Sequence, residues 1–150
     1  MSTLVTAQPV SLLRRLGAMF YDFMLIGATV MIVGGIINTI VSQVLGLPEI
    51  PPRSTLANLL FLLEILMIYG LLGWFWTHGG QTLGMRAWQI KVVTFDGQPL
   101  NWQQVTVRFI VSIISLIAFG AGFIIALFDP EKMTWHDRYS RTKLIFAPRK

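Results

Sequence analysis

Two side chains of opposite charge, Arg15 and Asp22, lie at the start of a long apolar segment, where ionisable groups could take part in binding ions or protons. Asp22 is the only acidic or basic residue between Leu16 and Val44. A carboxylate in apolar surroundings is costly unless something neutralises it, and carboxylates inside membranes with altered pKa values can carry ions or protons. The pair therefore indicates either a structural ion network or an ion or proton site.

The spacing of these two residues determines how each can be neutralised. They are seven positions apart, almost two helical turns, so they share a helix face but lie about 10 Å apart along the axis. A direct salt bridge is therefore out of reach, and each needs a partner from elsewhere. We expect Asp137 to reach Arg15, and Arg108 or Arg86 to neutralise Asp22, which would form a charge cluster at the base of a helical bundle.

The composition indicates which solvent surrounds these charges. Of the 150 residues, 54% are hydrophobic and only 13% are charged. A soluble domain usually has about a quarter charged residues, so this chain is expected to lie in a lipid bilayer. The net charge of +5 comes from basic residues that flank apolar segments, which is typical of cytoplasmic flanks beside anionic lipid and not of a nucleic-acid interface.

Several kinds of site are not expected. The chain has no cysteine, which excludes disulfides, thiolate metal sites and a cysteine nucleophile, and its two scattered histidines make no metal site. His136 and Asp137 are adjacent, so their side chains diverge on a helix, and no serine stands in a nucleophile elbow. We therefore expect no cofactor, no metal and no enzymatic activity.

Two segments are predicted to cross the membrane as helices, one over about 12–44 and one over about 55–76. The first is longer than the hydrocarbon core requires, so its ends must project or tilt. The segment from Gly46 to Ser54 contains three prolines and one cation, Arg53, which indicates a turn on the side of the membrane poor in positive charge.

Glu64 is placed near the middle of the second predicted helix, with no other charged residue in that helix. One interpretation is a residue that faces the bundle and is hydrogen-bonded to neighbouring helices or protonated. The other is a relay carboxylate near the membrane midplane. Both require Glu64 to face protein or water and not lipid.

A small extramembrane β-element is predicted in the amphipathic segment over about 81–100. Ile90 to Phe95 is β-branched and aromatic, and Asp96-Gly97 is typical of a hairpin turn. The C-terminal segment over about 140–150 contains Thr142 to Phe146, which could pair with Ile90 to Phe95. Such pairing would place the central loop and the C-terminus on one side of the membrane.

The third apolar segment, within about 102–139, is interrupted by Gly120-Ala121-Gly122. A single crossing would place the cation-rich tail opposite the other basic flanks, against the positive-inside rule. We therefore favour a turn at the glycines, after which Ala121 to about Tyr139 returns as a partly polar helix packed inside the bundle. The predicted fold is an all-α bundle of three to four membrane-embedded helices, with the N-terminus, the β-element and the C-terminus in the cytoplasm.

Short motifs in a fixed order extend over nearly the whole chain. They are Arg15, Ala18 and Asp22; Gly80-Gln81-Thr82-Leu83-Gly84 with Arg86; Val92-Val93 with Asp96-Gly97; Arg108; His136-Asp137; and Thr142. Together they resemble the RDD family of bacterial membrane proteins, named for one arginine and two aspartates, which correspond to Arg15, Asp22 and Asp137. A lysine commonly follows the Thr-Leu-Gly motif in this family, whereas this chain has Met85.

The resemblance implies a multi-pass protein of the bacterial cytoplasmic (inner) membrane that forms one domain over residues 1–150. Because some members are linked to cation/proton antiport or to transport generally, we expect transport of a monovalent cation coupled to protons, or of another small solute, through carboxylates inside the membrane. So small a bundle can hardly enclose a pathway alone, so we expect a homo-oligomer or a membrane-protein partner. The alternative is a non-catalytic accessory or assembly protein that binds a larger membrane complex.

Overall fold

A computed structural model describes residues 10–148. The chain forms two compact units: unit 1 comprises Met1–Asp22 and Leu72–Lys150, and unit 2 comprises Phe23–Leu71. Helix α1 (Leu12–Thr29), the π-helical segment η1 (Val30–Gly34) and α2 (Gly35–Val44) follow one another without a break. Helix α3 covers Thr55–His78.

Two helical stretches are long and apolar enough to cross a membrane, Leu12–Val44 with mean hydropathy 2.1 and Thr55–His78 with 2.0. Only 6% of an 18-residue apolar stretch of each helix is buried within the protein. Large apolar side chains such as Met31 and Phe61 are therefore exposed, at 79% and 63%. Exposed apolar surface on this scale fits lipid and not water, so the predicted helical membrane protein is confirmed.

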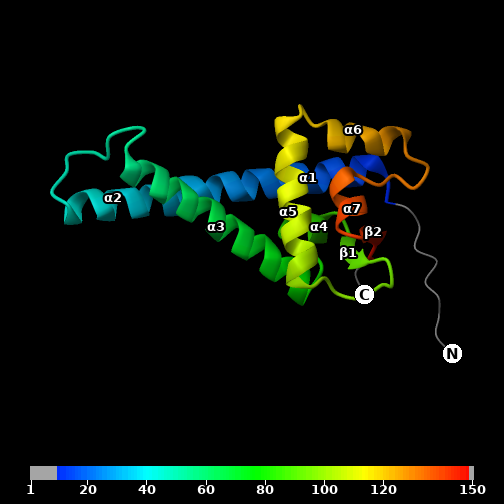
Figure 1. The fold of residues 1–150 in the computed structure, drawn as a ribbon. Helices are drawn as coiled ribbons and strands as arrows, with labels where there is room; N and C mark the ends of the chain where they lie inside the picture. Colours follow the sequence, from blue (N-terminus) through cyan, green and yellow to red (C-terminus); the bar gives the residue numbers. More distant parts are fainter. Residues whose placement is uncertain (1–9, 149–150) are drawn as a thin grey trace. The chain divides into compact units, whose positions relative to one another are not determined.

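Unit 2 is a helical hairpin. Its first arm contains the end of α1, then η1 and α2, and its second arm is the first part of α3 (Figure 1). The turn over 45–54 contains Pro48, Pro51 and Pro52, which cannot donate the hydrogen bonds that would continue a helix. Ser54 then begins α3, because its hydroxyl accepts a hydrogen bond from the backbone N–H of Ala57 at 3.1 Å.

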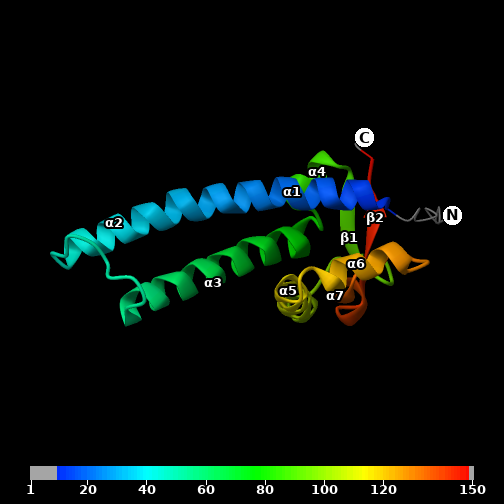
Figure 2. The ribbon, with the colours of Figure 1, turned by 90° about the horizontal axis from the view of Figure 1, so that it is seen from above.

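Unit 1 contains a two-stranded antiparallel sheet, seen with its strands side by side in Figure 2. Strand β1 (Ile90–Thr94) pairs with β2 (Thr142–Phe146), with Ile90 opposite Phe146 and Thr94 opposite Thr142. The predicted pairing of these segments is therefore confirmed. Gly97 makes a turn with φ +78°, but it leads the chain towards a helix and not into an adjacent strand, so the predicted Asp96-Gly97 hairpin is wrong.

Between the strands lies the third apolar segment, which is sharply broken. Helix α5 (Trp102–Ile117) begins with a capping box in which Asn101 and Gln104 each bond the other's backbone N–H. Helix α6 (Ala121–Phe128) follows at an angle of 96° to α5 (Figure 1). The break lies at Ala118–Gly120, where Gly120 has φ +77°, while Gly122 is already inside α6.

The returning arm differs from the prediction. The sequence suggested one helix from Ala121 to about Tyr139, whereas α6 ends at Phe128 and a separate short helix, α7, covers Trp135–Tyr139. Pro130 lacks a backbone N–H, and Lys132 adopts a left-handed conformation with φ +55°, so the helix cannot continue through these positions. Helix α4 (Leu83–Ala87), which precedes β1, completes unit 1.

Candidate functional site

The carboxylate of Asp137 is the centre of the charged site in unit 1. Asp137 lies in the first turn of α7 and is 0% exposed. It forms a capping box with Thr134, whose backbone N–H donates to Oδ2 of Asp137 at 3.2 Å, while the Asp137 N–H faces the Thr134 hydroxyl. The local helix start therefore fixes the direction of this carboxylate before any charged partner is considered.

Two buried guanidinium groups bind the two oxygens of that carboxylate. Nη1 of Arg15 donates to Oδ2 of Asp137 at 2.9 Å, and Nη1 of Arg108 donates to Oδ1 at 2.5 Å. Arg108 also donates to the Thr142 hydroxyl at 2.8 Å and lies 5.3 Å from the ring centre of Trp76. We call Arg15, Arg108 and Asp137 the ion cluster; it connects α1, α5 and α7, and through Thr142 it reaches β2.

The electrostatics of the ion cluster favour an ionised aspartate. Burial alone would raise the pKa of Asp137, but the positive charges of Arg108 and Arg15 outweigh it and hold that pKa well below its usual value. His136 lies beside the cluster, with Nε2 3.8 Å from Oδ1 of Asp137. Burial and the charge of Arg108 lower the pKa of His136 to about 3, so its imidazole is neutral at physiological pH.

Asp22 makes a separate contact. Its Oδ1 accepts the backbone N–H of Gly84 at 2.8 Å, and its Oδ2 accepts the Thr82 hydroxyl. Thr82 is the N-cap of α4, and the same hydroxyl accepts from the N–H of Met85 at 3.2 Å. Asp22 therefore satisfies donors at the start of α4, where a negative charge is also favoured by the helix dipole.

Close packing accompanies this contact between α1 and α4. A Cβ atom added at Gly84 would collide with the backbone carbonyl of Ala18 and with the Asp22 carboxylate, and one at Gly17 would collide with the ring of Trp88. Ala18 itself is only 1% exposed. The small residues of both segments are thus required for α1 to approach α4.

The structure brings together only part of the predicted charge cluster. Arg15 and Asp137 meet as expected, but Asp22 bonds Thr82 and Gly84 instead of a cation. The expectation that Arg108 or Arg86 neutralises Asp22 is therefore wrong: Arg108 binds Asp137, and Arg86 is exposed on α4. A half-buried carboxylate with two donors does not need a cation, which the sequence argument did not consider.

Other polar contacts of unit 1 were missed. Asp129 Oδ2 accepts from Nη2 of Arg138 at 2.5 Å, and the Ser140 hydroxyl lies 2.7 Å from that of Thr142. The pattern Thr134-x-x-Asp137 could have indicated a capping box, since an acidic side chain three residues after a threonine is a helix-start pattern. No pattern in the sequence could have paired Asp129 with Arg138.

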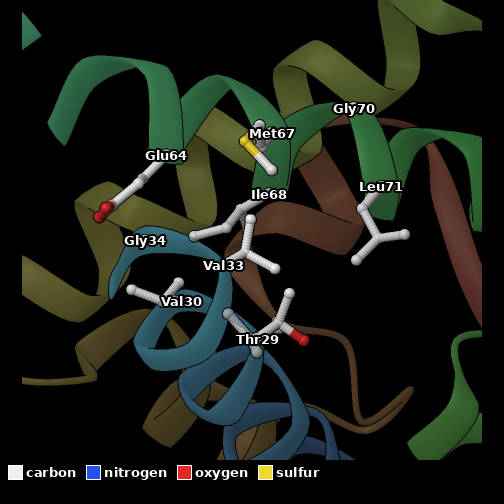
Figure 3. A pocket seen from close by; sticks show the side chains of 10 residues that line it. Thr29, Val30, Val33, Gly34, Glu64, Met67, Ile68, Gly70 and Leu71 are labelled. Atoms are coloured by element: carbon white, nitrogen blue, oxygen red, sulfur yellow. The ribbon is translucent and has the colours of Figure 1, made fainter. Parts of the chain in front are cut away.

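Glu64 lies in unit 2 and is treated separately from the ion cluster. It is half-buried, and its carboxylate lies against Gly34 at the end of η1, where an added Cβ would be 3.1 Å from the carboxylate carbon (Figure 3). Among residues 10–148 no hydrogen bond or ion pair is formed by this carboxylate. It borders a cavity of about 380 Å³ lined mainly by apolar side chains of both arms of the hairpin.

The described residues offer no site for a metal held by several side chains. Nowhere in 10–148 do three or more His, Cys, Asp or Glu residues come together in a way that could hold a metal ion. The candidate sites among the described residues are therefore the ion cluster with the Asp22 contact in unit 1, and the carboxylate of Glu64 beside the cavity of unit 2.

Comparison with known proteins gives one match. The model of the RDD family matches residues 9–141, which is most of the chain and includes every residue of the ion cluster. No curated protein and no solved structure matches the chain.

Proposed function

This chain belongs to the RDD family, and from that premise we propose that it is a non-enzymatic transporter that exchanges a monovalent cation for a proton. The Glu64 carboxylate would bind the two in turn. The observation that carries this proposal is an ionisable group on an apolar span with no bonding partner in the part of the chain described, at the edge of a cavity of about 380 Å³. Ionisable residues in membrane helices commonly mark ion or proton pathways.

The contacts of the family-defining residues support giving this role to Glu64. Arg15 and Asp137 bond one another, and Asp22 is occupied by Thr82 and Gly84. A cation at Asp137 would have to displace a guanidinium and leave it buried without its counter-charge, which is costly. We assign these three residues to holding α1, α4 and α7 together and not to exchange.

The π-helical segment beside Glu64 supports a site that changes shape. Segment η1, Val30–Gly34, ends at the glycine that contacts the Glu64 carboxylate, and a second glycine, Gly35, follows. Single π-helical turns inside α-helices are rare and are frequent at functional sites. We propose that the hydrogen bonds of η1 rearrange to those of an α-helix and that this change opens and closes access to Glu64.

The sheet of unit 1 supports the proposed orientation. Strand β1 precedes α5 and β2 follows α7, yet the two strands are hydrogen-bonded to each other. The segment Trp102–Phe128 would therefore enter and leave the membrane on one face, bent by 96° at its break. Basic residues lie in and beside the two strands, so we propose that the sheet faces the cytoplasm of a bacterial inner membrane.

We further propose that the transporter is a homo-oligomer. Two crossing helices and one bent segment cannot surround a pathway, and the apolar faces of unit 2 are exposed over most of their length. A second copy could cover part of that surface and close the cavity beside Glu64. The rival role, an accessory protein that binds a larger membrane complex, would use the same exposed faces.

Reconstitution tests the proposal. Purified protein in liposomes containing a pH-sensitive dye should move protons when a gradient of a monovalent cation is applied, and the Glu64→Gln variant should lose at least nine-tenths of this activity. Glu49→Gln removes the same charge from the exposed turn of unit 2 and should leave exchange unchanged. If the wild-type protein moves no protons with Na⁺, K⁺ or an organic cation, the transport role is wrong and the accessory role is favoured.

A further inference from the structure

The cavity of unit 2 has the size of a small-molecule site and almost no polar lining. Its volume of about 380 Å³ lies at the lower end of the range for ligand pockets, roughly 300–1,000 Å³. Side chains of valine, isoleucine, leucine and methionine form most of its wall, including Val33, Met67 and Ile68 (Figure 3). This wall offers contact to an apolar body larger than a simple ion.

All but one of the few polar groups at the wall already form hydrogen bonds within the protein. The Thr29 hydroxyl donates to the backbone carbonyl of Leu25 at 2.8 Å, and the carbonyl of Gly34 accepts from the Asn38 side chain at 2.9 Å. The carboxylate of Glu64 is the remaining polar group of the lining. A ligand in this cavity therefore meets apolar surface over almost the whole wall, with one carboxylate at the edge of the cavity beside Gly34.

This arrangement discriminates between kinds of cation. An inorganic cation gives up its hydration shell only where several oxygen atoms replace the lost water, and this cavity supplies one carboxylate. An organic cation with an apolar body needs one counter-charge and obtains its remaining contacts from the walls. We propose that the cavity beside Glu64 binds a lipophilic organic monocation, a substrate class that rests on the exchange function proposed above.

One proton balances the charge of each cation that Glu64 binds. When Glu64 is protonated, binding of the cation releases that proton, and the carboxylate and the cation then form a neutral pair. No other titratable group faces the carboxylate from the first arm, because Phe23 to Val44 contains no acidic, basic or histidine residue. Within unit 2 the other ionisable groups are Tyr69 on α3 and Glu49 and Arg53 in the turn.

The first experiment measures binding of tetraphenylphosphonium to the purified full-length protein in detergent. We expect saturable binding to the wild type and to Glu49→Gln, with Kd at least tenfold higher for Glu64→Gln. Apparent affinity should fall as pH is lowered, because protons compete for the carboxylate, and this dependence should vanish in Glu64→Gln. Equal affinity of the wild type and Glu64→Gln would overturn the proposal.

Tetraphenylborate, an anion of the same shape, tests whether charge matters. It should bind the wild type at least tenfold more weakly than tetraphenylphosphonium. Equal binding of the two ions would overturn the proposal and indicate a site for apolar chains, such as those of lipids, whatever their charge.

A second variant tests the cavity without touching the charge. A Cβ at Gly70 would meet no atom within 4 Å, so the Gly70→Phe side chain can enter the cavity that Gly70 lines. We expect it to raise the Kd for tetraphenylphosphonium at least tenfold, with Gly70→Leu as the smaller alternative should the phenylalanine variant not fold. Unchanged affinity in a folded Gly70 variant would overturn the location of the site.

The two proposals fail differently. Proton movement driven by Na⁺ or K⁺, together with no binding of tetraphenylphosphonium, would retain cation/proton exchange and overturn the organic substrate class. Binding of tetraphenylphosphonium at Glu64, with no proton movement in liposomes for any cation, would retain the site and overturn exchange.

Discussion

The two units of the chain each contain a carboxylate away from bulk water, but the surroundings of the two carboxylates are opposite. In unit 1, Asp137 is completely buried and its two oxygens are bonded to two guanidinium groups and a backbone N–H. In unit 2, Glu64 is half-buried against Gly34 and forms no bond among the described residues. The first carboxylate is held ionised by two buried cations, whereas the second has no partner among the described residues and is the one to which we assign the proposed exchange.

In the proposed function, the residues that define the family stabilise the fold and do not bind the transported ion. The contacts of Arg15, Asp22 and Asp137 connect segments far apart in sequence, and a carboxylate held by two cations cannot release them without a large loss of stability. A transported ion needs a site from which it can leave. Glu64 meets that requirement better, although the family name does not refer to it.

Matched substitutions of carboxylate by amide should give the largest contrast. Asp137→Asn leaves Arg15 and Arg108 buried without their counter-charge and should lower the free energy of unfolding by about 3–5 kcal/mol. Glu64→Gln should change it by less than about 0.5 kcal/mol, since it breaks no contact. Denaturant titration in detergent measures both, and equal losses would remove the distinction between the units.

Acidification should destabilise unit 1 through His136. Its folded-state pKa, about 3, is below the ordinary value of 6.5, so the unfolded chain takes up a proton first as pH falls. Stability is therefore complete above pH 6.5 and is lost towards pH 3, with a slope of at most about 1.4 kcal/mol per pH unit. The lowered pKa of Asp137 adds its own loss only below its ordinary value of 3.8.

Thermal unfolding of wild type and His136→Gln between pH 7 and pH 4 is the measurement for this prediction. The variant should show a flatter profile than the wild type over this range, because glutamine takes up no proton. Parallel profiles would show that another group dominates acid unfolding.

Two glycine substitutions compare packing in the two units. Gly84→Ala forces a methyl group against the Ala18 carbonyl and the Asp22 carboxylate and should cost about 1–3 kcal/mol. Gly70→Ala meets nothing within 4 Å and should stabilise α3 by about 0.5–1 kcal/mol. Denaturant midpoints of the two variants should therefore shift in opposite directions, and a shared direction would contradict the packing described for α1 and α4.

The smallest effect is expected at the edge of unit 1. Arg138 bonds Asp129 at 2.5 Å, but its side chain is 54% exposed, so water and salt screen the pair. Arg138→Gln should change the unfolding temperature little, and the change should shrink further as salt is added. A loss comparable to that of Asp137→Asn would place this pair among the essential contacts.

Much of the fold could be predicted from local patterns. The length of the apolar segments predicted both long helices, and β-branched residues predicted β1 and β2. The glycines around Gly120 predicted the break of the third segment. These features depend only on residues that are close in sequence. The Arg15–Asp137 contact was predicted because charge and topology left few partners. Pro130 was a sequence signal for the end of α6 at Phe128 that the prediction did not use, whereas the left-handed conformation of Lys132 leaves no mark in the sequence.

The error at Asp22 has a physical cause. A carboxylate in an apolar segment suggests a cation, but backbone N–H groups at a helix start are equally good donors and leave no mark in the sequence. The cavity of unit 2 was also out of reach, because it depends on how the side chains of two helices pack. Only Glu64 itself could be recognised as unusual.

The bond between Arg15 and Asp137 also governs the order in which the protein can be completed. The two residues are separated by 122 positions, so α1 and α5 are synthesised with their arginines before the carboxylate that neutralises them exists. Unit 1 can close only after α7 and β2 have left the ribosome. A chain truncated before α7 would contain both long apolar helices yet lack this closure, and we expect it to be degraded faster than the complete protein.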